Sequence, residues 1–376
     1  MTLITLGVLA RYLETTNYSE YLYFYAIAVI VSGLSDGGIR DSCYYLVSKS
    51  LSRKLFNHIY KVKILVTLAV FSTALLFKLL LPQSSLGVLL TVALLGCTLP
   101  VSDVGLMILK ARNQPSVELA LGIIEGVIAI VVFYNVGSQG LSFEFCLIVI
   151  ALLGLARSLL SYLFSKSCIE LDVENIAPIK YGFRSGSSIM PIFLGNFYNR
   201  IPALLLVDLI PAQSYNVLVT FLTLVQRMEV IPTALLQSQL ANRNSINGLS
   251  GNIFNVLVAL TGIGLVLLVI LALLNEKLVL LLMGSGYIDF ADTALIIIFV
   301  LPFVLVAYGA RYFLQLELRV RSCSLWLFFC LVQSILTLYF YELTDYKAHA
   351  LWINYFIYTI GFVLIAKNYL KLVSKK

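Results

Sequence analysis

Residues 254–274 read FNVLVALTGIGLVLLVILALL, an apolar stretch without a charged side chain. A helix needs about 20 such residues to cross the hydrocarbon core of a bilayer, which is about 30 Å thick. Lipid offers the backbone no hydrogen-bond partners, so a spanning segment is either a helix or part of a closed barrel. A barrel strand would alternate apolar and polar residues. This stretch is continuous, and it therefore predicts a transmembrane helix.

The same pattern recurs along the chain. Of its 376 residues, 60% are apolar and 12% are charged, whereas a soluble domain carries about 25% charged residues. The other apolar runs are 3–13, 18–34, 64–81, 86–109, 117–136, 143–164, 188–209, 215–236, 291–310, 324–341 and 351–370. The sequence therefore predicts an all-α integral membrane protein with about twelve transmembrane helices and no sizeable soluble domain.

The first run and the middle of the chain carry two further expectations. Run 3–13 would reach only about 16 Å, so we expect a truncated first helix, caused by a late start codon or a shortened chain. It has neither the basic segment nor the cleavage site of a secretory signal. The polar stretch 165–186 divides the runs six and six. This predicts an N-terminal six-helix bundle (1–164), a cytoplasmic linker (165–186) and a C-terminal six-helix bundle (187–376), as in transporters built from repeats.

Lysine and arginine residues set the expected orientation. If the N-terminus is cytoplasmic and each run crosses once, only Arg11, Lys78, Lys277 and Lys347 fall in outer segments. Nearly all the others, Lys63 and Arg157 among them, are assigned to inner segments, as the positive-inside rule requires. We therefore expect both termini in the cytoplasm, and short outer connections such as 275–290. The net charge of +7 is explained by anchoring at anionic headgroups rather than by nucleic-acid binding.

The sequence offers little for catalysis. Its histidines, His58 and His349, lie in predicted loops on opposite sides, and its six cysteines show no C-x-x-C spacing. A G-x-x-x-x-G-K-[ST] phosphate-binding loop is also missing from the sequence. A metal site, a nucleophile–histidine pair and ATP hydrolysis are therefore not predicted. No cofactor is expected, and an enzyme is disfavoured.

Charged residues inside the runs are the informative ones, because each costs about 2.5–3.5 kcal/mol at the bilayer centre. They are Asp103, Glu125, Arg200, Arg227 and Glu229. Two interpretations stay open: structural ion pairs between helices, for example Arg200 with Glu229, or the lining of a polar central cavity. Arg227 and Glu229 are separated by about 200° around a helix, so they should not pair with each other.

Two of these runs carry further signals. Glu125 lies beside Gly122 and Gly126, whose spacing also suits a seam where two helices pack closely. Pro191 and Pro202 occur in the same run as Arg200, and prolines at that separation predict a bent helix.

Short motifs along the chain resemble those of a known family. The stretches are ARYL (10–13), SDGGIR (35–40), ILKAR (108–112), YNR (198–200), IPTAL (231–235) and LLMGSGY (281–287). Their order and placement resemble those of Wzx-type O-antigen and polysaccharide flippases, which belong to the multidrug/oligosaccharidyl-lipid/polysaccharide (MOP) exporter superfamily. The resemblance covers nearly the whole chain. It departs at the missing start of helix 1 and at Asn199, where the family commonly has aspartate.

The resemblance implies two six-helix bundles around a central cavity that opens to one side at a time. The implied cargo is a polysaccharide repeat unit linked by pyrophosphate to undecaprenol, carried from the cytoplasmic to the periplasmic leaflet of the bacterial inner membrane. Other implied partners are the polysaccharide polymerase and the chain-length machinery. Three alternatives remain. A drug or small-solute antiporter of the same superfamily predicts a smaller, more acidic and aromatic cavity, and an O-antigen polymerase predicts a long outer loop. The third is a non-transporting scaffold of the polysaccharide machinery, for which no residue argues directly.

A pyrophosphate group crossing a bilayer needs cationic and hydrogen-bonding partners. The residues expected along its pathway are Arg40, Asn196, Asn199, Arg200, Arg227 and Arg311. The acidic residues expected to balance their charge, or to carry a coupling proton or cation, are Asp36, Asp103, Glu125 and Glu229.

Overall fold

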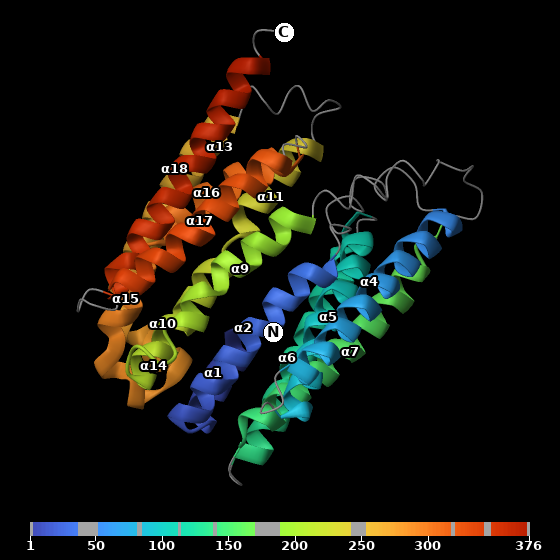
Figure 1. Cartoon of the computed structure of the whole chain (residues 1–376), viewed down its shortest axis with the longest axis horizontal. Coiled ribbons are helices and arrows are strands. Elements are labelled where there is room, and N and C mark those ends of the chain that lie inside the picture. Colours follow the sequence, from blue (N-terminus) through green and yellow to red (C-terminus); the bar gives the residue numbers. More distant parts are fainter. Residues whose placement is uncertain are drawn as a thin grey trace. The chain divides into compact units, whose positions relative to one another are not determined.

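The computed structural model describes most of the chain, and its regular elements there are helices (Figure 1). The described residues are 3–36, 52–80, 85–111, 114–137, 141–169, 189–241, 253–316, 320–341 and 347–373. Within them, nine helical stretches are long and apolar enough to cross a membrane. The predicted all-α membrane fold is confirmed by these helices.

The chain divides into two compact units, Met1–Arg200 and Ile201–Lys376. The first unit contains α1 (Leu3–Tyr12), α2 (Thr15–Asp36), α4 (Arg53–Leu80), α5 (Leu86–Ala111), α6 (Pro115–Gly137), α7 (Phe143–Lys166) and most of α9 (Ile189–Leu205). Helix α5 packs against α2, α4, α6 and α7, so it forms the centre of this unit. The predicted linker lies largely outside the described residues, and the predicted bundle boundaries stay a prediction.

Small residues let the helices of the first unit approach closely. A Cβ atom on Gly96 of α5 would lie 2.9 Å from the carbonyl oxygen of Ala28 in α2. A Cβ atom on Gly154 of α7 would lie 2.8 Å from the hydroxyl of Thr98 in α5. The Ser35 hydroxyl donates to the Gly96 carbonyl at 2.7 Å. Close backbone approach and hydroxyl-to-carbonyl bonds are the means by which membrane helices associate without a hydrophobic driving force.

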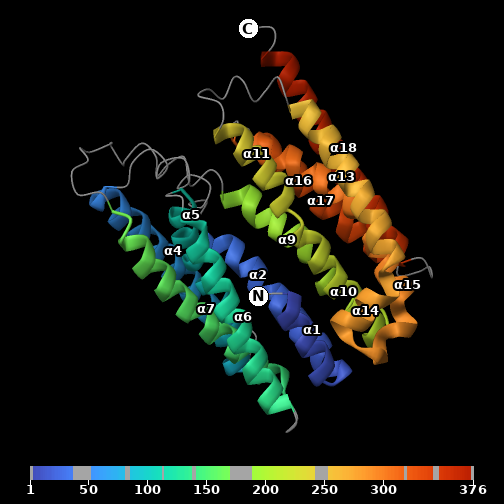
Figure 2. The same ribbon diagram turned by 180° about the vertical axis from the view of Figure 1, so that it is seen from behind.

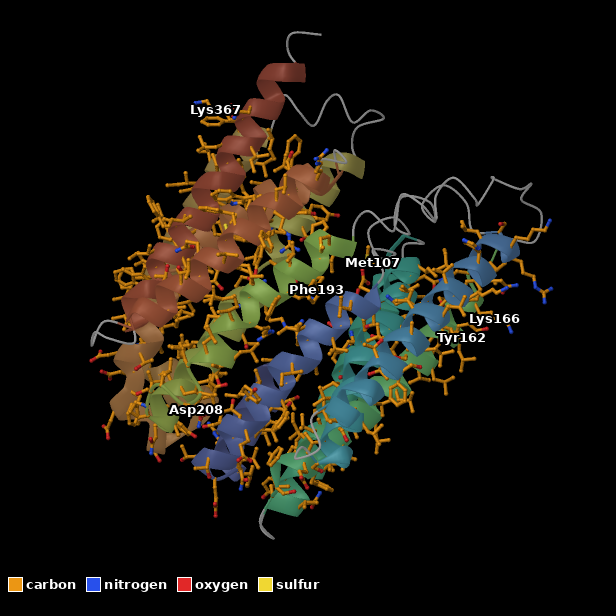
Figure 3. All side chains as sticks on the ribbon, viewed as in Figure 1. Met107, Tyr162, Lys166, Phe193, Asp208 and Lys367 are labelled. Atoms are coloured by element: carbon orange, nitrogen blue, oxygen red, sulfur yellow. The ribbon has the colours of Figure 1, made fainter. Side chains whose placement is uncertain are left out.

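The second unit contains the rest of the helices. They are α10 (Ala212–Arg227), α11 (Val230–Ala241), α13 (Ile253–Leu273), α14 (Asn275–Met283), η1 (Ser285–Phe290), α15 (Ala291–Ile298), α16 (Leu301–Leu316), α17 (Val320–Tyr341) and α18 (Lys347–Val373). Helix α16 packs against α11, α13 and α18 (Figure 2). Asp208 and Lys367 lie at opposite ends of this unit (Figure 3), in agreement with the alternation of connections that the sequence predicts.

Two predicted runs are broken helices rather than single ones. Run 215–236 forms α10 and α11 with a turn at Met228 and Glu229, and run 291–310 forms α15 and α16 with a turn at Phe299 and Val300. Proline has no amide hydrogen and clashes with the carbonyl four residues earlier. Pro232 lies four residues after Met228, and Pro302 follows the second turn, so each proline accounts for the interruption before it.

The connection 275–290, predicted as a loop, is helical. Helix α14 follows α13 after one turn residue, Leu274, and η1 leads directly into α15. Between α14 and η1 lies Gly284, whose φ of 96° is a conformation that residues with a Cβ atom rarely adopt. The apolar residues 278–283 inside this connection explain why it folds back onto the bundle instead of extending into water.

Candidate functional site

Arg200 lies in the first unit against an aromatic stack of α2. Its guanidinium carbon is 5.8 Å from the centroid of the Tyr25 ring. The Tyr25 ring stacks on Tyr21 at 6.0 Å, and Tyr21 stacks on Tyr18 at 6.4 Å. All three rings and Arg200 are buried. A cation over a desolvated aromatic face is stabilised by the ring quadrupole, so this stack holds Arg200 in place.

Asn196, one helical turn before Arg200, also contacts α2. Its side-chain amide donates to the Val29 carbonyl at 3.3 Å. A Cβ atom on Gly33 would lie 2.9 Å from the same amide nitrogen. Asn199 is buried as well. The two pathway residues Asn196 and Arg200 therefore lie on one face of α9, toward α2.

Asp36 has a partner that the sequence analysis missed. The Lys63 ammonium of α4 lies 3.2 Å from Asp36 Oδ1 and donates to the Asp36 backbone carbonyl at 2.7 Å. The Lys63 side chain is fully buried. A lysine at a helix C-terminus satisfies the last carbonyls and complements the helix dipole. The buried atoms Asp36 Oδ2 and Thr67 Oγ1 have no hydrogen bond within the described residues.

Glu125 pairs with a second cation that had been assigned to the cytoplasm. Its Oε2 lies 2.7 Å from Nη1 of Arg157, and Arg157 lies inside α7, not in a segment between helices. The side chains are 11% and 21% exposed, respectively. The structural interpretation of Glu125, an ion pair between neighbouring helices, is therefore the one observed, since α6 packs against α7.

Arg227 and Glu229 flank the break between α10 and α11. Arg227 is the last residue of α10, and both side chains are exposed. The amides of Met228 and Glu229 bond to the carbonyls of Val225 and Gln226, at 3.1 Å each. Arg227 and Glu229 therefore do not lie on one continuous helix, and the predicted separation of about 200° does not hold for them. Discontinuous membrane helices commonly border the binding sites of transporters.

The second unit brings Glu229 and Arg311 together with three tyrosines. Arg311 of α16 lies beside Tyr358 of α18 and within electrostatic range of Tyr308 and Glu229. Tyr308 is also within range of Glu229 and Tyr355. We call these five residues the Arg311 cluster. Next to it, the Gln226 amide donates to the Tyr355 hydroxyl at 3.3 Å.

The cluster combines charge with unsatisfied hydrogen-bonding capacity. Tyr308 and Tyr358 are buried, and the Tyr308 hydroxyl has no hydrogen bond within the described residues. A buried polar group without a partner costs about 1–3 kcal/mol and is commonly satisfied by a ligand or water. The three tyrosines carry no sequence signal, because the chain has 22 tyrosines and nothing in the sequence sets these apart.

The other predicted residues include one in the first unit and one that the structure does not describe. Asp103 lies on α5 in the first unit, and Arg40 lies outside the described residues. An ion pair between Arg200 and Glu229 stays a prediction. Among the described residues, no group of histidine, cysteine, aspartate and glutamate side chains is arranged to hold a metal ion.

Solved structures share this arrangement of helices. A MATE protein in complex with MaL6 matches with a TM-score of 0.69 and 12% identity, over 100% of this chain and 95% of that chain. The chain has the fold of MATE transporters. An inward-facing multidrug resistance MATE family transporter of the MOP superfamily matches with a TM-score of 0.64 and 12% identity, over 99% of this chain and 94% of that chain.

An outward-facing structure of a multidrug resistance MATE family transporter gives a TM-score of 0.66 and 13% identity, over 100% of this chain and 94% of that chain. No protein-family model matches the sequence, and no curated protein matches it. The MATE fold confirms the predicted helical, two-bundle membrane architecture. The O-antigen flippase itself stays a prediction.

Proposed function

We propose that this chain is a flippase that moves undecaprenyl-pyrophosphate-linked repeat units of O-antigen or capsule across the bacterial inner membrane by alternating access. The MATE fold supports a transporter, since solved members are both inward- and outward-facing. The motif resemblance supports the lipid-linked cargo. In this proposal the polysaccharide polymerase and the chain-length machinery act on the units that the flippase delivers.

The Arg311 cluster is the observation that carries the proposal. An arginine offers a planar fork of donors that matches two phosphate oxygens at once. The Tyr308 hydroxyl lacks a hydrogen bond within the described residues, so it is suited to bind a phosphate or sugar oxygen. Two ion pairs among the described residues of the first unit use Lys63 and Arg157, which are not cations of the proposed pathway.

An antiporter for a cationic drug is the second candidate, and the same cluster favours it in part. Glu229, within electrostatic range of Tyr308 and Tyr358, resembles part of an acidic, aromatic site for an organic cation. The two candidates assign opposite roles to the charges. The flippase needs Arg311 to bind cargo, whereas the antiporter needs Glu229 and is hindered by Arg311.

The test uses cells that make the polysaccharide but lack this gene. Lipid-linked units are probed with a periplasmic enzyme that acts only on sugars exposed outside. The intact gene should restore access, Arg311→Gln should fail, and Arg311→Lys should restore it partly, because the charge stays while the fork is lost. Arg321→Gln, an exposed arginine at the start of α17, is the matched control, and membrane insertion is checked for each variant.

The outcomes separate the candidates. Units trapped inside without the gene establish the flippase. Normal exposure of units, together with loss of drug efflux, establishes the antiporter and should be accompanied by sensitivity to Glu229→Gln. Single units that reach the outside but never polymerise indicate a polymerase instead.

A further inference from the structure

The connection between α13 and α15 contains an apolar helix that is too short to span a membrane. Helix α13 has 21 residues, about 32 Å in length, and so fills the hydrocarbon core by itself. Asn275, Glu276 and Lys277 then mark a polar boundary, after which residues 278–283 are again apolar. Helix α14 has 9 residues, about 14 Å in length. It therefore starts where the core ends and cannot cross it.

One face of α14 is fixed to the second unit. Asn275, Val279 and Met283 recur every four residues and are buried, and α14 packs against η1 and α15. The Asn275 amide donates to the Ala291 carbonyl at 2.7 Å. Gly284 turns the chain into η1, where the Tyr287 hydroxyl accepts from the Asn216 amide of α10 at 3.3 Å. These contacts make α14 a fixed element at the end of the unit opposite the C-terminus of α18 (Figures 1 and 2).

The other face of α14 presents leucines. Leu281 is 68% exposed and Leu280 is 45% exposed, while Leu273 and Leu274 before them are 80% and 40% exposed. Helix α14 contacts α13, whose exposed apolar residues include Ile270. Helix α13 must face lipid on that side because its length and composition suit a span. Exposed leucines at the end of a lipid-facing helix and on the short helix that follows it call for a cover that is also apolar.

We propose that α14 is an interfacial helix, and that Leu280 and Leu281 enter the headgroup boundary of the leaflet at this end of the second unit. An amphipathic helix in that position buries its apolar face about 5–10 Å into the boundary. The exposed charged residues around it, Glu276, Lys277, Asp289 and Asp292, include more acids than bases. Attraction to anionic lipid is therefore not what holds it, and its insertion depends on the leucines. The inference does not depend on the cargo.

Fluorescence quenching tests the position of Leu281. Single cysteines are placed at 281, 277 and 279 in full-length protein whose own cysteines are replaced, labelled with an environment-sensitive dye, and reconstituted in phosphatidylcholine vesicles. Nitroxide-labelled lipid should quench the dye at 281 several-fold more than the dye at 277, and iodide in the water should show the reverse order. A label at buried position 279 should be protected from both quenchers, provided that this variant still folds.

Two results would overturn the inference. Iodide quenching at 281 equal to that at 277 would place the leucines in water. Protection of the dye at 281 from both quenchers would mean that protein covers this face. If protection occurs in the vesicles, the cover is a second copy of the chain; if it occurs only in native membranes, the cover is another protein. Leu281→Lys gives an independent measurement in an unlabelled chain, because a charge placed in an apolar boundary should lower thermal stability in phosphatidylcholine vesicles, whereas a leucine that faces water could be replaced without loss.

Discussion

Replacing Lys63 by methionine tests whether the buried pair at the end of α2 holds the first unit together. The Lys63 side chain is fully buried, and its ammonium lies 3.2 Å from Asp36 Oδ1 and 2.7 Å from the Asp36 carbonyl. Removing one partner of a buried ion pair costs about 3–5 kcal/mol, because the other charge is left without compensation. We therefore expect Lys63→Met to lower the free energy of unfolding by that amount.

The second half of the cycle separates the charge from the helix cap. Asp36→Asn keeps the backbone carbonyl that Lys63 binds, so it should cost less, about 1–3 kcal/mol. The double variant Asp36→Asn with Lys63→Met removes both charges, and its cost should fall short of the sum of the single costs by about 1–3 kcal/mol.

Unfolding of the purified protein in mixed micelles, followed by circular dichroism, measures all four members of the cycle. Lys61→Met is the matched control, because Lys61 is exposed two residues earlier on the same helix, and it should stay within about 0.5 kcal/mol of the parent. The reasoning is refuted if Lys63→Met costs no more than Lys61→Met, or if the single costs simply add.

Two further substitutions test the packing and the helix break in the second unit. Gly264→Ala would place a Cβ atom 2.8 Å from the Pro302 Cα, so it should lower stability by about 1–3 kcal/mol, measured by thermal unfolding. For Gly262→Ala, the added Cβ atom would have no other atom within 4 Å, so stability should be unchanged or slightly raised. Equal effects of the two substitutions would contradict the observed packing. Pro232→Ala restores an amide that can bond to the Met228 carbonyl, so hydrogen exchange at 228–232 should slow. Unchanged exchange would mean that tertiary contacts, not the proline, keep the helix broken.

The sequence predicted helices well where they are uniformly apolar, and poorly where they are amphipathic. Helix α4 begins at Arg53, well before the predicted run at 64. Its first turns expose Arg53 and Lys54 but bury Phe56 and Tyr60. A hydropathy average over residues 53–63 mixes the polar and the apolar face, so the segment is predicted as a loop. Burial of one face depends on neighbours that are distant in sequence, which an average over adjacent residues does not detect.

Proline positions predicted kinks but not breaks. Pro100 and Pro202 lie inside continuous helices, whereas Pro232 and Pro302 follow interruptions. The residue type is the same in all four cases. What differs is how the surrounding helices pack around the carbonyl that lies four residues before each proline and lacks its helical hydrogen bond. This packing is tertiary structure, which the local sequence does not determine.

The sequence predicts that charged residues inside the membrane need partners of opposite charge, but it does not identify those partners. Asp36 and Lys63 are 27 residues apart, and Glu125 and Arg157 are 32 apart, so their pairing depends on how α2 meets α4 and how α6 meets α7. Both cations had been assigned to the cytoplasm, because a lysine or arginine near the end of a run satisfies the positive-inside rule equally well when it is buried.

The charged residues inside the two units have different surroundings, and this difference favours the second unit as the place where the proposed cargo binds. In the first unit, Asp36 and Glu125 each have a cation within ion-pair distance, so moving either charge would break a contact that stabilises the fold. In the second unit, Glu229 lies at a break whose amides are already bonded to nearby carbonyls. The break therefore needs no ligand to satisfy its backbone. In the proposed function, a proton or cargo phosphate that arrives at the Arg311 cluster changes the charge balance there, while the backbone amides of the break are already bonded.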